Sequence, residues 1–138
     1  MAADVPGAVD GLHNEITRGL VIRPPAVEQI LRGTKRWEIR GRPVRIRGPV
    51  ALIEVGSPRI RGVCEIVDCL GPLSERAMER NAHLHRAPER YWRGGDAYAR
   101  VFAWVLGRPR RLRRPWRYIH PRGAVTWVNL RSRLIRGK

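Results

Sequence analysis

Three charged residues close together in the chain, Lys35, Glu38 and Arg40, have side chains suited to acid–base chemistry or to binding an anion. Lysine supplies two of the 28 basic residues, and the other one is Lys138. An ammonium, unlike a guanidinium, can lose its proton, and neighbouring positive charge would lower the pKa of Lys35 and make it a better proton carrier or nucleophile. Glu38 could act as a general base or accept a hydrogen bond from a base edge, and Arg40 could bind a phosphate bidentately. The alternative is an exposed network of ion pairs, which would contribute little to stability.

A strand, a short helix and a second strand are expected to position these residues. The apolar run at residues 19–22 predicts the first strand. Residues 24–33 predict the helix, because two prolines stand at its start, apolar residues recur at i, i+3 and i+4, and a glycine is placed to end it. Residues 36–40 alternate as a strand does, so the side chains of Glu38 and Arg40 should leave the same face.

The remaining segments predict an α+β fold, a small barrel of about six strands with two or three helices on its flanks. Ser74 is a plausible N-cap for a polar helix that runs to about residue 80. The segments 81–98 and 107–123 are expected to be loops, the first with a helical turn or two and the second rich in arginine and proline. Further strands are expected at residues 50–55, 60–70, 100–106 and 124–130.

Charge and length limit the class of protein. A chain of 138 residues with 43% hydrophobic residues should form one domain, here residues 18–131 between a flexible arm (1–17) and a basic tail (132–138). The net charge of +16 favours a polyanionic partner, and most of that affinity would depend on salt. Nucleic acid is favoured over a membrane surface because no long basic amphipathic helix is evident.

The two cysteines and the first residues of the chain favour the cytoplasm. Cys64 and Cys69 make no disulfide framework and are expected to be small buried residues in a reducing compartment. Residues 1–10 lack the basic and apolar regions of a secretory signal. No apolar run is long enough to span a bilayer.

Aromatic residues alternate with arginines in two places. Bases stack on such rings while arginines follow the backbone, so Trp116 and Tyr118 are expected to contact single-stranded nucleic acid. In the Tyr91-Trp92-Arg93 segment, packing of Trp92 at a barrel end is the favoured interpretation. The other three tryptophans, Trp37, Trp104 and Trp127, are expected in the core. The arginines expected to bind the backbone are Arg45, Arg47, Arg110, Arg111, Arg113 and Arg114.

No metal site is predicted. His83 and His85 form an H-x-H pair, but a site normally needs three or four ligands, and no nearby cysteine or acidic partners are evident. A serine–histidine–aspartate order and a phosphate-cradling glycine loop are absent from the sequence as well.

Three segments form a recognisable pattern: Gly33-x-Lys35-x-x-Glu38-x-Arg40, Val50-Ala51-Leu52-Ile53 and Ile60-x-Gly62-x-x-x-Ile66. This pattern resembles the ASCH (ASC-1 homology) domain family. The resemblance covers roughly residues 19–131 and implies a PUA-like β-barrel with a nucleotide or nucleic-acid site in a cleft between barrel and helix. It places Lys35, Glu38 and Arg40 in that cleft, with Ser57 as a weaker addition.

The resemblance implies a binding module or an enzyme. As a binding module, the domain would hold single-stranded RNA through its arginines and probe a nucleotide in the cleft, with no cofactor. As an enzyme, it would use Lys35 and Glu38 as a hydrolase, either a ribonuclease with a divalent metal or an amidohydrolase acting on N4-acetylcytidine. Family members with the second activity use a lysine, a threonine three residues later and a distant glutamate. Here Lys35 matches, Glu38 stands in the threonine position, and Glu89 is a candidate for the glutamate.

Overall fold

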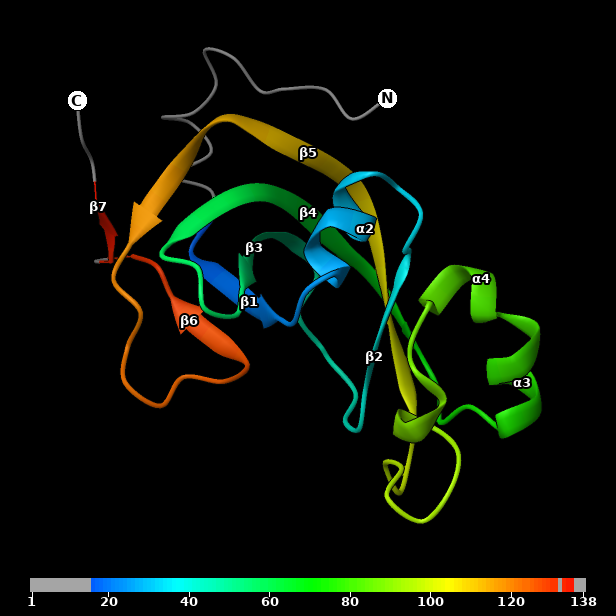
Figure 1. Ribbon diagram of the computed structural model, residues 1–138. Coiled ribbons are helices and arrows are strands. Elements are labelled where there is room, and N and C mark those ends of the chain that lie inside the picture. Colours follow the sequence, from blue (N-terminus) through cyan, green and yellow to red (C-terminus); the bar gives the residue numbers. More distant parts are fainter. Residues whose placement is uncertain (1–15, 132, 136–138) are drawn as a thin grey trace.

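In the computed structural model, which describes residues 16–131 and 133–135, one strongly curled sheet forms an open barrel with helices beside it (Figure 1). The α+β barrel predicted from the sequence is confirmed. The helices are α2 (Ala26–Leu31), α3 (Glu75–Arg80), α4 (Ala82–His85) and a 3₁₀ turn, η1 (Glu89–Tyr91). The strands are β1 (Arg18–Ile22), β2 (Trp37–Arg40), β3 (Gly48–Glu54), β4 (Arg59–Leu70), β5 (Phe102–Tyr118), β6 (Trp127–Asn129) and β7 (Leu134–Ile135).

The barrel is open because its two edge strands, β2 and β6, do not pair with each other in the described part of the chain. The sheet runs β2-β5-β4-β3-β1-β6, and β7 pairs with the far end of β5. Neighbouring strands are antiparallel except β1 and β3, which are parallel. The parallel pair requires a crossover, which α2, β2 and the turn after β2 supply. Both β1 and β3 therefore end at the same edge of the sheet, beside the start of α2.

The predicted short helix packs against the sheet through its apolar face. Val27, Ile30 and Leu31 of α2 are each at most 1% exposed and belong to a core cluster with residues from β1, β3, β4 and β5. A Cβ atom at Gly62 would lie 2.3 Å from Cδ2 of Leu31, so a glycine in β4 allows the helix to approach this closely. Ser74 caps α3 as predicted, since its Oγ accepts a hydrogen bond from the Ala77 amide.

The prediction of a loop at residues 107–123 was wrong, because β5 continues to Tyr118. Leu112, Trp116 and Tyr118 are buried between exposed arginines, which is an alternation that a strand can use. Pro109 and Pro115 are accommodated because the register of β5 against β4 is irregular close to both of them. The arginine and proline content of this segment suggested a loop, but its backbone pairs with β4 and β7 and is therefore a strand.

Other boundaries also differ from the predictions. The last strand, expected at residues 124–130, is limited to β6. Two residues of the predicted basic tail form β7, while residues 132 and 136–138 lie outside the described part of the chain. Residues 1–15 of the predicted arm are also outside it, and Ile16 is buried in the core. None of the helices within the described ranges is long and apolar enough to cross a membrane.

The predictions for small and aromatic core residues are largely confirmed. Cys64 is buried, whereas Cys69 is only partly buried. Trp92 and Trp104 are buried. Trp37 and Trp127, also expected in the core, are only half-buried and pack against its border.

Candidate functional site

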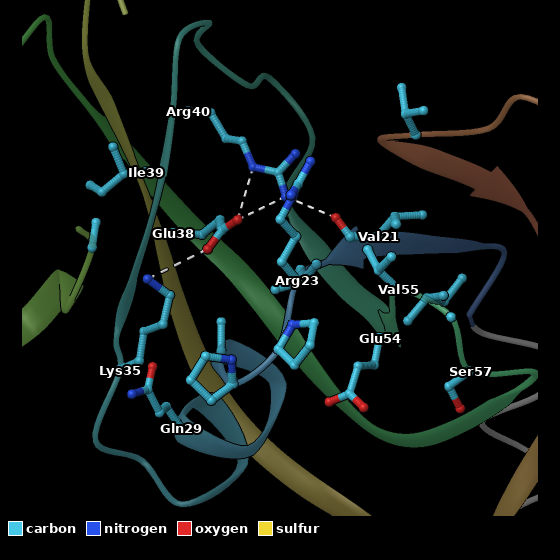
Figure 2. Close-up of a pocket in the computed structure, with 18 of the residues that line it drawn as sticks. Val21, Arg23, Gln29, Lys35, Glu38, Ile39, Arg40, Glu54, Val55 and Ser57 are labelled. Carbon is cyan, nitrogen blue, oxygen red and sulfur yellow. Dashed lines mark hydrogen bonds and ion pairs between the residues drawn. The ribbon is translucent and has the colours of Figure 1, made fainter. Parts of the chain in front are cut away.

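A pocket of about 1140 Å³ opens at the edge of the sheet where β1 and β3 end (Figure 2). One wall comes from α2 and β2, and another from the segment that follows α4. At one end of the pocket lie Lys35, Glu38 and Arg40, which we call the floor cluster. The three residues predicted from the sequence motif therefore lie together in a cavity.

Lys35 is fixed by the end of α2 and by α4. Its backbone amide and that of Thr34 both donate to the carbonyl oxygen of Gln29, which closes the helix, and Gly33 adopts a φ of +84° just before them. The side chain then reaches across to α4, where its Nζ donates to the carbonyl oxygen of His85. Because Arg36 also donates from its backbone to α4, through the Leu84 carbonyl, the two elements hold the ammonium in one place.

Glu38 lies between the two cations of the floor cluster. Its Oε1 is 3.5 Å from Nζ of Lys35, and its Oε2 is 2.7 Å from Nη2 of Arg40. The same carboxylate oxygen accepts from Nε of Arg40 at 2.9 Å, and Nη2 of Arg40 also donates to the Val21 carbonyl. The guanidinium lies 5.5 Å from the ring centroid of Trp104. As predicted, Glu38 and Arg40 leave the same face of β2 and meet.

The floor cluster is not the exposed network considered as the alternative. Lys35 is 5% exposed and Glu38 is 8% exposed. Burial lowers the pKa of Lys35, Glu38 acts in the opposite direction, and Arg40 lowers it further. The predicted direction of this pKa shift is therefore correct, but the prediction attributed it to neighbouring charge, whereas loss of solvent is the larger cause. One carboxylate faces two basic side chains, so the cluster carries a net positive charge when both are protonated.

His85 supports the floor cluster, and hydrogen bonds within the protein engage both of its ring nitrogens. The Ala87 amide donates to its Nδ1, so the proton lies on Nε2, which donates to the Met78 carbonyl at 2.8 Å. Burial lowers the pKa of His85 and keeps the ring neutral. Within the part of the chain that the structure describes, no three His, Cys, Asp or Glu side chains come together as a metal site.

The far end of the pocket contains two other predicted residues, Ser57 and Tyr118. Tyr118 is 5% exposed, and its hydroxyl is hydrogen-bonded to Nδ1 of His120 at 2.8 Å. Burial raises the pKa of this phenol. Trp116 does not reach the pocket and is 4% exposed within the core, so the expectation that bases stack on its ring was wrong. The alternation of β5 turns every second side chain inward, and Trp116 is one of these.

The predicted arginines of β5 divide into two groups, those that lie beside a carboxylate and those that do not. Glu28 forms a bidentate ion pair with Arg111, which with Arg32 lowers the pKa of the carboxyl to about 2. Glu65 lies 3.7 Å from Arg110. Arg113 and Arg114 are exposed and form no ion pair with a carboxylate of the described residues.

The turn after β2 carries the other two predicted arginines. Arg45 is exposed, and Arg47 lies 3.8 Å from Asp68. None of the six predicted backbone-binding arginines lines the pocket.

Several residues that line the pocket were not predicted. Tyr91 and Tyr98 stack on each other with ring centroids 5.9 Å apart, and the guanidinium of Arg90 lies 4.9 Å from the centroid of Tyr91. Arg23 and Arg86 are exposed at the pocket wall. The segment around Tyr91 had an aromatic and basic signal in the sequence, but nothing there indicated that it faces β2, some fifty positions earlier in the chain.

Comparison with protein families matches the ASCH domain model to residues 20–115. The chain belongs to the ASCH domain family. ASCH domains are PUA-like and in general bind nucleic acid. No curated protein matches the chain.

Among solved structures, the chain is similar to ASCH from Zymomonas mobilis, with 15% identity, a TM-score of 0.59 and coverage of 83% of this chain and 87% of that one. Crystal structures of two variants of that protein are similar to the same degree. In one variant a tyrosine is replaced by phenylalanine, with 16% identity, a TM-score of 0.58 and coverage of 83% and 90%. In the other a serine is replaced by alanine, with 16% identity, a TM-score of 0.58 and coverage of 83% and 88%. At this level of identity the likeness is one of fold.

Proposed function

We propose that this protein binds single-stranded RNA and holds one nucleotide of the strand above the floor cluster. The observation that carries the proposal is the buried, net positive floor cluster at the end of an open pocket in a chain of net charge +16. A positive charge that is fixed and partly removed from solvent attracts an anion more strongly than one in free solution. Membership of the ASCH family supports the same class of ligand.

The chemistry of the cluster suits a nucleotide. Glu38 is an acceptor with lone pairs that remain beyond its contacts to Lys35 and Arg40, so it can accept from an amino group on a base edge. Tyr91 and Tyr98 form an aromatic surface beside it on which a base can stack. The pocket therefore combines base recognition with stacking at one end.

The rim of the pocket suits the phosphates. Arg23, Arg86 and Arg90 are exposed at the pocket wall, and none forms an ion pair with a carboxylate of the described residues. A guanidinium without a carboxylate partner is available for phosphate, which it binds bidentately. Phosphate contacts fix the position of the strand without reading its sequence.

The test is the affinity of a fluorescent single-stranded RNA for the whole chain, measured by anisotropy at several salt concentrations. Arg90→Ala removes a charge at the pocket rim, and we expect a loss of about tenfold, as for one charge-assisted contact. Arg76→Ala removes the same charge from the exposed surface of α3 and should change affinity less than twofold. Equal losses from the two variants, or RNA binding that does not depend on salt, would contradict a site in the pocket.

A hydrolase that uses the same pocket is the second candidate, and the lowered pKa of Lys35 is what favours it. A lysine that loses its proton more easily is a better proton carrier beside a carboxylate 3.5 Å away. Against it, Glu38 already faces two cations. Glu89, the candidate for the distant glutamate, is 64% exposed, pairs with Arg93 and does not line the pocket.

Product analysis separates the two functions. The chain is incubated with single-stranded RNA, with and without Mg²⁺, and separately with N4-acetylcytidine. Release of acetate or of shortened RNA that Lys35→Met abolishes, while RNA affinity stays within about twofold, would establish the hydrolase. Unchanged substrates under all conditions, together with the affinity loss in Arg90→Ala, would establish the binding module.

A further inference from the structure

The pocket has room for more than the nucleotide assigned to the floor cluster. Pockets that enclose a drug-sized ligand occupy about 300–1,000 Å³. A mononucleotide is a ligand of that size, and this pocket, at about 1140 Å³, exceeds the upper end of the range. Figure 2 shows why, since Lys35 lies at one end of the pocket and Ser57 at the other.

The far end of the pocket has a different chemistry from the floor cluster. Val55 and Val125 line it and are 50% and 77% exposed, so apolar surface faces the solvent here. His120 lies beside them with both ring nitrogens engaged, Nδ1 by the Tyr118 hydroxyl and Nε2 by the Ala124 carbonyl. The imidazole is exposed and meets the Tyr118 ring in a T-shaped contact, with ring centroids 5.7 Å apart, so a ligand can reach the ring through a face and not through its nitrogens. This end is therefore suited to stacking on a base and not to reading its edge.

Arg23 lies between the two ends. It follows directly after β1, lines the pocket and is exposed, and Figure 2 shows it between the floor cluster and Val55. Its guanidinium makes no hydrogen bond or ion pair with any other described residue. An exposed guanidinium between the two ends of the pocket is placed to bind the single negative charge of a phosphodiester.

We propose that the pocket holds two successive nucleotides of a single strand. The first base lies at the floor cluster, Arg23 binds the phosphodiester that joins the two nucleotides, and the second base stacks on His120 and the two valines. This inference rests on the proposed function and adds a second subsite to it. The first subsite distinguishes bases through hydrogen bonds, whereas the second accepts any base because every base has a face to stack.

The decisive experiment compares a nucleoside 5′-monophosphate with a dinucleoside monophosphate as ligands of the whole chain, by calorimetry or by competition with labelled RNA. The monophosphate ester carries between one and two charges at neutral pH, and the phosphodiester carries one. Tighter binding of the dinucleotide therefore cannot come from charge. We expect the dinucleotide to bind about tenfold more tightly, from one added stacking contact, with little dependence on its second base.

Variants at the far end show where the second base lies. His120→Ala should remove the tenfold advantage and leave the affinity for the mononucleotide unchanged, whereas His120→Phe, which keeps a ring, should preserve much of it. Arg23→Gln should weaken the dinucleotide and leave a nucleoside without phosphate unaffected. His83→Ala is the matched control, because His83 is exposed on α4 and does not line the pocket.

The outcomes separate this inference from the proposed function. Equal affinity for the two ligands, or a His120→Ala loss that is the same for both, would overturn the second subsite while the floor cluster still binds a nucleotide. If Arg90→Ala changes the affinity for neither of these ligands nor for a long single-stranded RNA, the proposed function fails and this inference fails with it.

Discussion

The floor cluster and the arginines of β5 are both dense in positive charge, but they differ in burial and in how their charges are paired with carboxylates. In the floor cluster, two cations share one carboxylate in a nearly buried position at the end of a pocket. Along β5, Arg108, Arg110 and Arg111 lie beside Glu65 or Glu28, while Arg113 and Arg114 are exposed and have no carboxylate partner among the described residues.

The difference between these two regions shows that the positions of the few carboxylates, and not those of the many arginines, determine where positive charge is left unpaired. With 12 acidic against 28 basic residues, most arginines have no acidic residue to pair with. A carboxylate beside an arginine on the surface neutralises its charge locally, as Glu28 does for Arg111. A carboxylate placed between two buried cations stabilises their burial and still leaves a net positive charge.

Trp116 should show the largest effect, on stability and not on binding. Trp116→Ala removes a ring that is 4% exposed in the core, so we expect a loss of about 4 kcal/mol in the free energy of unfolding. Urea denaturation measures it, and the RNA affinity of the folded protein should not change. A stable variant with weakened RNA binding would instead mean that β5 presents this ring to the ligand.

Glu38 should show the next largest effect. Glu38→Gln leaves the ammonium of Lys35 buried without its carboxylate, and breaking a buried ion pair in this way costs about 3 kcal/mol. Glu79→Gln is the control, because Glu79 is 55% exposed and its partner Arg93 keeps contacts to Glu75 and Glu89. That control should lose less than about 0.5 kcal/mol. Similar losses from both variants would mean that solvent screens the floor cluster.

The two groups of β5 arginines can be compared directly at equal net charge. Replacing Arg113 and Arg114 by glutamine should weaken RNA binding about tenfold and reduce the salt slope by about 1.4, for two phosphate contacts to a single strand. Replacing Arg108 and Arg110, which lie beside Glu65, removes the same charge and should have a smaller effect on both quantities. If the two double variants behave alike, total charge governs binding and the ion pairs do not.

Glu28 should show the smallest effect, and one that depends on pH. The side-chain hydrogen bonds from Arg111 and the ion pair with Arg32 lower its pKa from 4.5 to about 2. The folded state therefore binds a proton less readily than the unfolded state. The resulting stability is present above pH 4.5 and is lost as the pH falls from 4.5 to about 2.

Because the Glu28 side chain is 31% exposed, solvent weakens these ion pairs, and Glu28→Gln should cost about 1 kcal/mol at neutral pH. Thermal unfolding between pH 2 and 7 measures it, and the variant should lose less stability than the parent chain as the pH falls. If the stabilities of the variant and the parent chain fall in parallel down to pH 2, the ion pair between Glu28 and Arg111 does not couple α2 to β5.

Local patterns were enough to predict much of the fold and the core of the site. Apolar periodicity gave α2, β1, β3 and β4, and Ser74 marked the start of α3. The sequence placed Glu38 and Arg40 on one face of β2 because strand alternation depends only on neighbours in the chain. It failed at residues 107–118, where pairing with β4 overrode a composition typical of loops.

By itself the sequence determined the charge of the chain, the elements around Lys35 and the motif that identifies its family. Tertiary structure alone decided that this motif is buried, that Trp116 points inward, and that Arg23, Tyr91, Tyr98 and His120 share a pocket with it. The physical reason is that burial and proximity depend on which strands pair. β1 and β3 end at one edge of a curled sheet, and segments up to about a hundred residues apart meet there.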